Sequence, residues 1–215
     1  MNSRNDQPSV LVTGAAGYVG RHVVTSLLDR GFAVVATCRA GGGAARIDAR
    51  ARIVETDILS DDIAIDSLVD ASTVSVVHLA WQDGFAHNAR SHMLNLSAHY
   101  RFLAALADAG VPRIAVLGTM HEVGYWEGAI TEDTPTAPSS LYGIAKDALR
   151  RSVLQGLGDA TELAWLRCYY IYGDDRQNRS IFTRLLEASD EGKTSFPFTT
   201  GTKKYTTDHP GTPPR

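Results

Sequence analysis

The sequence predicts an α/β fold, a doubly wound parallel sheet with helices on both faces. Short apolar runs that suit buried strands alternate with longer stretches of helical periodicity, which is the pattern of βαβ units. A glycine-rich turn, Gly14-Ala-Ala-Gly17-Tyr-Val-Gly20, directly follows the first apolar run. The 215 residues are enough for one such domain and part of a second lobe.

The expected elements follow the apolar pattern along the chain. Strands are predicted over residues 10–13, 32–37, 52–56, 74–80, 113–118 and 163–167, the third of them edge-like. Helices are predicted over residues 18–30, 61–69, 88–109, 139–156 and 180–188. Gly31 and Gly110 are expected to end helices, and Ser139 or Ser140 is the expected N-cap of the helix that begins there.

Composition and charge exclude several classes of protein. A net charge of −3 implies no strong attraction to nucleic acid or to an anionic membrane surface. The apolar runs are too short to span a bilayer, and the polar residues 1–9 do not resemble a signal peptide. Two cysteines, Cys38 and Cys168, make no disulfide framework and fit a reducing cytoplasm. The scattered histidines have no metal-ligand spacing, so no metal is expected.

The glycine-rich turn is the expected site of a dinucleotide pyrophosphate. One glycine makes the tight turn, one lets the backbone approach phosphate, and one lets the helix pack on the strand. The helix that follows offers unpaired N–H groups and a positive dipole end to the anion. The spacing Gly14, Gly17, Gly20 differs from the G-x-G-x-x-G fingerprint, and the alternative is a loop that binds no ligand.

The end of the second strand bears on the choice between NAD and NADP. An acidic residue there bonds the ribose 2′-hydroxyl, whereas an arginine suits a 2′-phosphate. The segment here is Thr37-Cys38-Arg39, which favours NADP(H), with Arg39 as the phosphate ligand and Arg46 as a second contact. The alternative is that Arg39 is only a solvated surface charge. Asp57 is placed to accept from an adenine amino group or to cap a helix.

Tyr142 and Lys146 lie four residues apart in a predicted helix and therefore on one face of it. A free tyrosine has a pKa of about 10, and a nearby ammonium lowers that pKa, so the pair suits acid–base work at a carbinol. Thr119 follows the fifth strand, at the sheet edge where ligands bind, and its hydroxyl suits a substrate oxygen. The alternative for the isolated pair is a surface tyrosine beside a solvated lysine.

Together these motifs resemble the extended short-chain dehydrogenase/reductase family, NAD(P)-dependent epimerases, dehydratases and reductases of nucleotide sugars with a Rossmann-like domain. The resemblance covers residues 10–205 and implies catalytic roles for Thr119, Tyr142 and Lys146, with Asn95 supporting the lysine through water. His78-Leu-Ala80 matches the fourth-strand motif, and 167–173 matches the segment beside the nicotinamide. The implied cofactor-binding residues are Gly14, Ala16, Gly17, Tyr18, Val19, Gly20, Arg39, Asp57, Ile58, Leu79, Ala80, Tyr142, Lys146 and Tyr169.

The sequence departs from the family pattern in three places. Met120 and His121 stand where family dehydratases carry an Asp-Glu pair, so 4,6-dehydration is not expected. Tyr170 replaces the usual asparagine near the nicotinamide. The family also continues well beyond Tyr205, whereas residues 206–215 look unlike it, which suggests a truncated or frame-shifted C-terminal lobe.

Four regions and one substrate class follow from these expectations. We expect a flexible tail over 1–8, an NAD(P)-binding domain over 9–173, a partial substrate-binding lobe over 174–205 and a disordered tail over 206–215. The substrate is expected to be a nucleotide sugar, and the resemblance implies pairing of two copies through the helices at 88–109 and 139–156. The expected substrate-side residues are Trp81, His121, Tyr170, Arg176 and Arg179.

The sequence leaves three functions open. The first is an epimerase or reductase acting on a sugar nucleotide. The second is a remnant that binds NADP(H) and turns over nothing, and the third is an NADP-dependent reductase of a non-sugar carbonyl. His121 is either an additional acid or base or a hydrogen-bonding pocket residue. Trp81 more often packs than stacks on a ligand.

The cofactor preference gives the first testable prediction. NADPH should bind the chain more tightly than NADH, because Arg39 pairs with the 2′-phosphate, and Arg39→Ala should remove the difference. Calorimetric titration with each cofactor measures both. Equal affinities in the unsubstituted chain would overturn this assignment.

Overall fold

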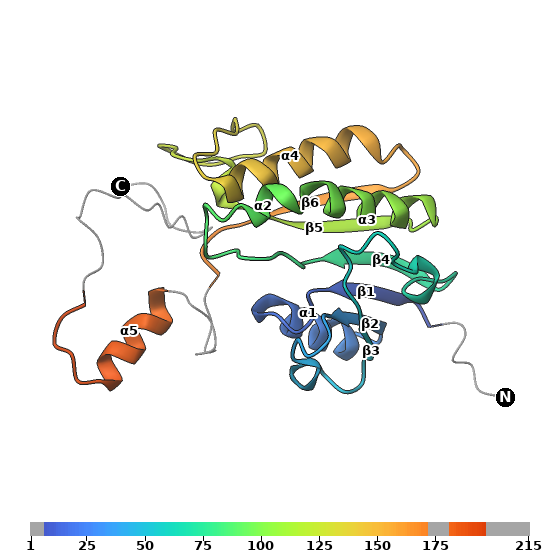
Figure 1. The fold of residues 1–215 in the computed structure, drawn as a ribbon, viewed down its shortest axis with the longest axis horizontal. Coiled ribbons are helices and arrows are strands. Elements are labelled where there is room, and N and C mark those ends of the chain that lie inside the picture. The colour runs from blue at the N-terminus through green and yellow to red at the C-terminus, as the bar shows by residue number, and fades with distance from the viewer. Residues whose placement is uncertain (1–6, 172–180, 197–215) are drawn as a thin grey trace.

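Six parallel strands form one sheet in the order β3-β2-β1-β4-β5-β6 (Figure 1). The computed structural model describes residues 7–171 and 181–196. The strands are β1 (Ser9–Thr13), β2 (Ala33–Cys38), β3 (Arg52–Glu55), β4 (Thr73–His78), β5 (Arg113–Thr119) and β6 (Glu162–Cys168). The helices are α1 (Tyr18–Asp29), α2 (Ser91–Leu94), α3 (Leu96–Asp108), α4 (Leu141–Gly156) and α5 (Ile181–Asp190).

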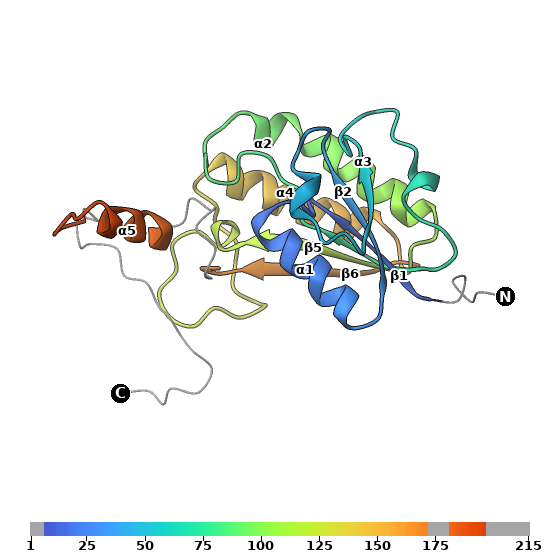
Figure 2. The same cartoon turned by 90° about the horizontal axis from the view of Figure 1, so that it is seen from below.

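Helices cover both faces of the sheet, as Figures 1 and 2 show together. Alternate residues of β1 belong to two cores because successive side chains of a strand point to opposite faces. Leu11 packs with Phe102 of α3 and Leu149 of α4 in one core. Val12 packs with Val24 of α1 in the other. The predicted doubly wound α/β fold is confirmed.

The order of the strands reverses between β1 and β4, the two strands at the centre of the sheet. Ligands of open α/β sheets bind at such a switch point, outside the carboxyl ends of the strands. Thr13 and His78 end these two strands side by side in register. Loops that carry the predicted site residues therefore leave the sheet from one edge.

Two predicted helices differ from the structure. The helix expected over 61–69 is only a short 3₁₀ turn, Ile65–Ser67. Side chains before it bond the local backbone instead, since Ser60 Oγ accepts from Asp62 N at 3.3 Å, and such bonds compete with helix formation.

The helix expected over 88–109 begins only at Ser91 and divides at Asn95 into α2 and α3. Backbone bonds continue across the break, because Asn95 N donates to Ser91 O and His99 N donates to Asn95 O. The torsion angles of Asn95, φ −93° and ψ −3°, depart from the mean helical values at the point where α2 ends and α3 begins.

Helix α4 begins as predicted. Ser140 is its N-cap and accepts from Gly143 N at 3.2 Å, which satisfies one of the helix's free N–H groups. Tyr142 therefore lies in the first turn, at the carboxyl edge of the sheet, and Lys146 lies one turn deeper.

The sheet and helices α1 to α4 lie within residues 9–171, and α5 lies within the region expected over 174–205. The division of the chain into four regions stays a prediction. Residues 206–215 lie outside the described part of the chain.

Candidate active site and cofactor pocket

The glycine-rich turn packs directly against the end of β4. Gly14 has φ +67°, and a Cβ there would lie 2.7 Å from Ala80 N. A Cβ on Gly20 would overlap the Gly14 carbonyl oxygen. Helix α1 starts after Gly17 without a side-chain cap, so its first-turn N–H groups remain available to an anion. The local geometry is that of a phosphate-binding turn.

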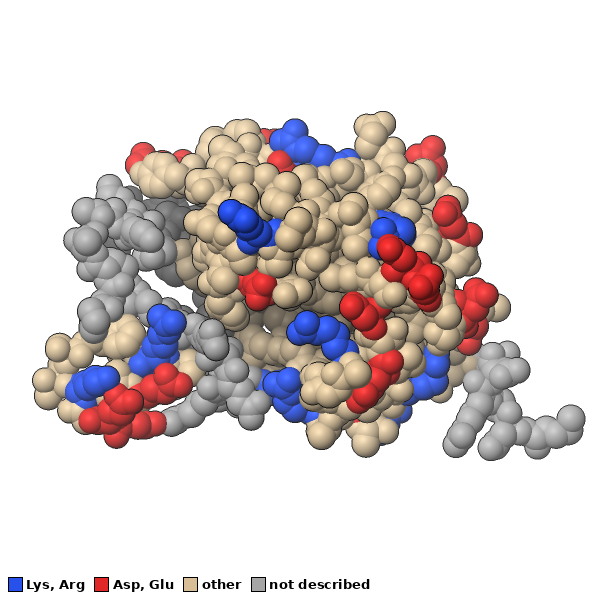
Figure 3. All heavy atoms as spheres, viewed as in Figure 1, with Lys and Arg blue, Asp and Glu red and all other residues tan. Residues whose placement is uncertain are grey.

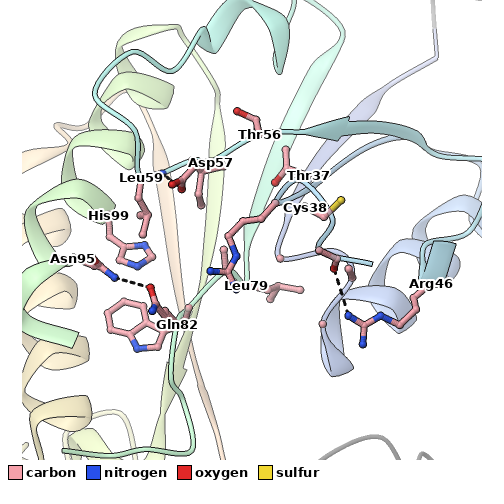
Figure 4. A pocket seen from close by; sticks show the side chains of 18 residues that line it. Thr37, Cys38, Arg46, Thr56, Asp57, Leu59, Leu79, Gln82, Asn95 and His99 are labelled. Atoms are coloured by element: carbon pink, nitrogen blue, oxygen red, sulfur yellow. Dashed lines mark hydrogen bonds between the residues drawn. The ribbon is translucent and has the colours of Figure 1, made fainter. Parts of the chain in front are cut away.

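A pocket of about 530 Å³ opens beside this turn (Figure 4). Its wall comes from the phosphate turn, from the loops after β2, β3 and β4, and from helix α3. Gly14, Ala16, Gly17, Arg39, Asp57, Ile58, Leu79 and Ala80, all predicted cofactor-binding residues, line it together with Trp81 and Asn95. Most of the predicted cofactor-binding residues therefore share one cavity.

Arg39 and Arg46 both reach this pocket from exposed positions. Arg46 Nη2 lies 3.4 Å from the Gly42 carbonyl oxygen, to which it donates. Asp57 accepts from Leu59 N at 3.0 Å through Oδ1 and so holds its own loop, while it also lines the pocket. This bond stabilises a turn and is not a helix cap, because no helix begins at Asp57. A contact of Asp57 with adenine stays a prediction.

Tyr142 and Thr119 meet where β5 ends and α4 begins, and their side chains are hydrogen-bonded. Thr119 Oγ1 also accepts from His121 N at 3.3 Å. The pKa of Tyr142 is raised, mainly because the phenol is largely buried; the bond from Thr119 opposes that shift without reversing it. The structure therefore brings two of the predicted catalytic residues together with the phenol in its protonated form.

Lys146 is buried beside this pair and is held by two contacts. Its Nζ donates to the Leu117 carbonyl oxygen at 2.6 Å and lies 4.0 Å from the centre of the Trp81 ring. Burial lowers the pKa of Lys146 to about 7. The pKa of Tyr142 is raised, first by its own burial and then by the Glu122 and Cys168 charges. That the Lys146 charge lowers the pKa of Tyr142 stays a prediction.

Glu122 bonds the backbone of Thr119 and two side chains of β6. Its side chain is fully buried, and Oε1 accepts from Thr119 N at 2.8 Å. Trp165 Nε1 and Arg167 Nε donate to the same carboxylate at 3.0 Å. Burying a carboxylate is costly unless donors bond it, and these three donors supply those bonds. The bond from Thr119 N also holds the end of β5 in place.

Aromatic side chains enclose Tyr142. The His87 ring is stacked on it with centroids 5.8 Å apart, and the His92, His121 and Trp81 rings lie within 5.2–6.1 Å. Trp81 also stacks on His99 at 4.4 Å and lines the pocket. Trp81 therefore connects the pocket with the Tyr142–Thr119 pair.

The remaining predicted site residues lie at different places, and not all of them line the pocket. Asn95 Nδ2 donates to Gln82 Oε1 at 3.2 Å at the pocket wall (Figure 4). Tyr169 and Tyr170 are exposed after β6, and Tyr170 has φ +28°. Tyr18 and Val19 begin α1 next to the turn. Arg176 and Arg179 lie outside the described residues.

Sequence reasoning missed the buried histidines. His92 and His99 are both about 1% exposed and lie on α2 and α3. The signal was present in the spacing, because residues 92, 95 and 99 are three and four positions apart and so share one helical face with Asn95. That face turns toward the pocket and Trp81.

Two further findings concern only residues 7–171 and 181–196. No cluster of three or more histidine, cysteine or acidic side chains there could hold a metal ion. No helix there has the length and apolar character that crossing a bilayer requires. Figure 3 shows acidic and basic side chains scattered over one face, without an expanse of one sign.

The buried imidazoles predict a fold that is sensitive to acid. Burial lowers the pKa of His99 to about 3 and the pKa of His78 well below 6.5, the value expected in the unfolded chain. The unfolded chain thus binds more protons between pH 6.5 and about 3, and stability falls as the pH is lowered through that window. Urea denaturation should show a loss of about 1.5 kcal/mol from His99 alone between pH 6.5 and about 5.

His99→Asn should reduce this pH dependence, since it deletes one of the imidazoles whose pKa is lowered by burial. His22→Gln, at an exposed position on α1, is the matched control and should leave the dependence unchanged. A stability that is constant across this pH range would contradict the burial of neutral His78 and His99.

Comparison with known proteins shows to which family this chain is similar. The model of the "NAD dependent epimerase/dehydratase family" matches residues 10–207. A curated relative, dTDP-6-deoxy-L-talose 4-dehydrogenase (NAD(+)) of Aggregatibacter actinomycetemcomitans, is 43% identical over 201 residues, covering 92% of this chain and 74% of the relative.

Solved structures agree with the fold. UDP-glucose 4-epimerase of Thermotoga maritima, solved with UDP-glucose, has a TM-score of 0.73 at 24% identity, covering 86% of this chain and 64% of that one. MoeE5, solved with UDP-glucuronic acid and NAD, has a TM-score of 0.68 at 29% identity, covering 84% and 60%. The chain thus spans less than two thirds of these solved structures. By the family model and by the first of these relatives, the chain belongs to the NAD-dependent epimerase/dehydratase family.

Proposed function

We propose that this chain transfers hydride between NAD(P) and a carbon of a nucleotide sugar, with Thr119, Tyr142 and Lys146 at the reacting centre. The observation that carries the proposal is the junction made by Trp81, which lines the pocket and also contacts Lys146 and Tyr142. A dinucleotide in that pocket would end beside the phenol. The cradle at Gly14 and Gly20, which a Cβ would fill, fits a pyrophosphate.

The bound nicotinamide would supply or accept the hydride, and the chain's own residues would handle the proton. Tyr142, protonated in this structure, is prepared to donate its proton to a sugar carbonyl oxygen as that oxygen gains charge. Thr119 bonds the phenol and orients it. Lys146, with a pKa of about 7, changes charge near neutral pH and can replace the proton that Tyr142 gives up.

The substrate class follows from relatives and from the loop after Thr119. The 43%-identical relative is named as a 4-dehydrogenase of dTDP-6-deoxy-L-talose. We therefore propose C4 of a dTDP-linked 6-deoxy sugar as the reacting position. Met120 and His121 provide no carboxylate pair for dehydration, which favours simple oxidation and reduction at that carbon.

The proposal includes a preference for NADP(H). Arg39 and Arg46 line the pocket, and the chain offers no acid directly after β2. The relative from Aggregatibacter is named for NAD(+), and MoeE5 was solved with NAD. These names weigh toward NAD(H), so the paired titration of NADPH and NADH decides this part of the proposal.

The proposal also includes pairing of two copies through the helices beside the site. Helices α2 and α4 contact each other, and both carry large apolar side chains that are exposed in the single chain. These residues are Met93, Leu94, Ile144 and Leu154. A second copy covering them would remove that apolar surface from water.

Substitution of the phenol tests the proposed chemistry. Tyr142→Phe should lower the rate of NAD(P)-linked oxidation of a dTDP-6-deoxyhexose by about 10²–10⁴-fold, because it removes the proton donor and acceptor. The affinity for cofactor should change less than about twofold, since the pocket wall is unaltered. The absorbance of reduced nicotinamide follows the rate, and calorimetry follows binding.

Tyr100→Phe is the matched control, because this tyrosine lies on α3 against Gly156 at the far end of α4. It should retain the full rate. Cofactor binding without turnover in the unsubstituted chain would favour the alternative of a binding protein. Unchanged turnover in Tyr142→Phe would contradict the assigned role.

A further inference from the structure

A line of hydrogen bonds runs from the end of β1 through two buried histidines to the pocket. Thr13 Oγ1 lies 2.9 Å from His78 Nδ1, and His78 Nε2 lies 3.0 Å from His99 Nδ1. Thr13 and His78 are completely buried, and His99 is 1% exposed. Three different elements, β1, β4 and α3, contribute one residue each.

The backbone around Thr13 fixes the direction of every proton in this line. Thr13 Oγ1 accepts from Leu79 N at 3.2 Å and from Ala80 N at 3.3 Å. Both acceptor positions of the hydroxyl are then occupied, so its proton is donated to His78 Nδ1. A neutral His78 therefore carries its own proton on Nε2 and donates it to His99 Nδ1. His99, in turn, must carry its proton on Nε2.

The Nε2 atom of His99 faces the pocket. No described residue bonds it, and no fully buried side-chain nitrogen or oxygen in residues 7–171 and 183–196 lacks a partner. His99 lines the pocket beside Asn95 and Gln82 (Figure 4). The line of bonds therefore ends in an N–H group offered to whatever enters the cavity.

We propose that His99 is a cofactor-binding residue whose Nε2–H donates to an oxygen of the dinucleotide, either on the pyrophosphate or on the ribose joined to it, and that Thr13 and His78 hold it in this tautomer. Stacking of Trp81 on the imidazole, with ring planes 14° apart, fixes the orientation of the ring. This inference rests on the proposed function, because it assumes that the pocket takes a dinucleotide.

The donor stays uncharged. Burial, with a further contribution from Lys146, lowers the pKa of His99 to about 3. A neutral N–H that is already oriented loses little entropy on binding and needs no counter-ion, whereas a lysine in the same place would add a second charge near Lys146. Its contribution should consequently be the same at pH 6 and pH 8, within the error of about 0.3 in log Kd.

Two substitutions separate the pocket-facing donor from the internal bond. His99→Asn places an amide oxygen near the position of Nδ1, so it can still accept from His78, but it removes the donor at Nε2. His99→Gln places an amide nitrogen near the position of Nε2 and keeps a donor for the pocket. The full chain is titrated with NADH, with ADP-ribose and with ADP, and the melting temperature of each variant is measured.

His99→Asn should weaken NADH binding by about tenfold or more, the effect of one hydrogen bond to a charged or well-placed oxygen. His99→Gln should recover most of that loss. A loss already present with ADP places the contact on the diphosphate or on the adenosine ribose, and a loss that appears first with ADP-ribose places it on the second ribose. A loss with NADH alone, or equal NADH affinity in the unsubstituted chain and His99→Asn, would overturn the inference.

Nitrogen-15 NMR of the imidazoles tests the same assignment without any ligand. His78 and His99 should both be neutral with the proton on Nε2, and this measurement decides the tautomer even where a variant fails to fold. A proton on Nδ1 of His99 would overturn the inference. An Nε2 proton on His99 in a chain that binds no dinucleotide would instead contradict the proposed function and leave the geometry intact.

Discussion

The close approach of the β1 and β4 ends is the constraint on which the rest of the site depends. Gly14 has no Cβ, so the Ala80 backbone can lie where that atom would be. Thr13 fastens the same junction by accepting from the Leu79 and Ala80 N–H groups. The sheet reverses its strand order here. The glycine-rich turn leads to α1 on one face of the sheet, and the loop after β4, which carries Trp81, leads toward α3 on the other face.

Several ionisable side chains are buried near this junction, and they are either hydrogen-bonded or uncharged. Glu122 is surrounded by donors from Thr119, Trp165 and Arg167, whereas His78 and His99 remain neutral. Burial lowers the pKa of Lys146 to about 7, so this group changes charge near neutral pH. An uncompensated charge in such surroundings would be costly, which is consistent with neutral imidazoles at His78 and His99.

Local patterns were sufficient to predict the sheet, four of the main helices and many of the residues that line the pocket. These features depend on residues that are neighbours in the sequence. Examples are the turn glycines at 14, 17 and 20, the apolar strands and the Ser140 cap. The failures involve distant partners. Burial raises the pKa of Tyr142, and only a short 3₁₀ turn forms within 61–69. The position of His99 depends on its contacts with Trp81 and His78, which are distant in the sequence.

Calorimetric titration of Gly14→Ala with NADPH tests the central claim most directly, with Gly31→Ala as the control. Both glycines have positive φ, but a Cβ would meet the β4 end only at Gly14 and nothing within 4 Å at Gly31. The account predicts tight binding by the unsubstituted chain and by Gly31→Ala, and loss of binding in a still-folded Gly14→Ala. Unchanged affinity in Gly14→Ala, or no binding by the unsubstituted chain, would contradict it.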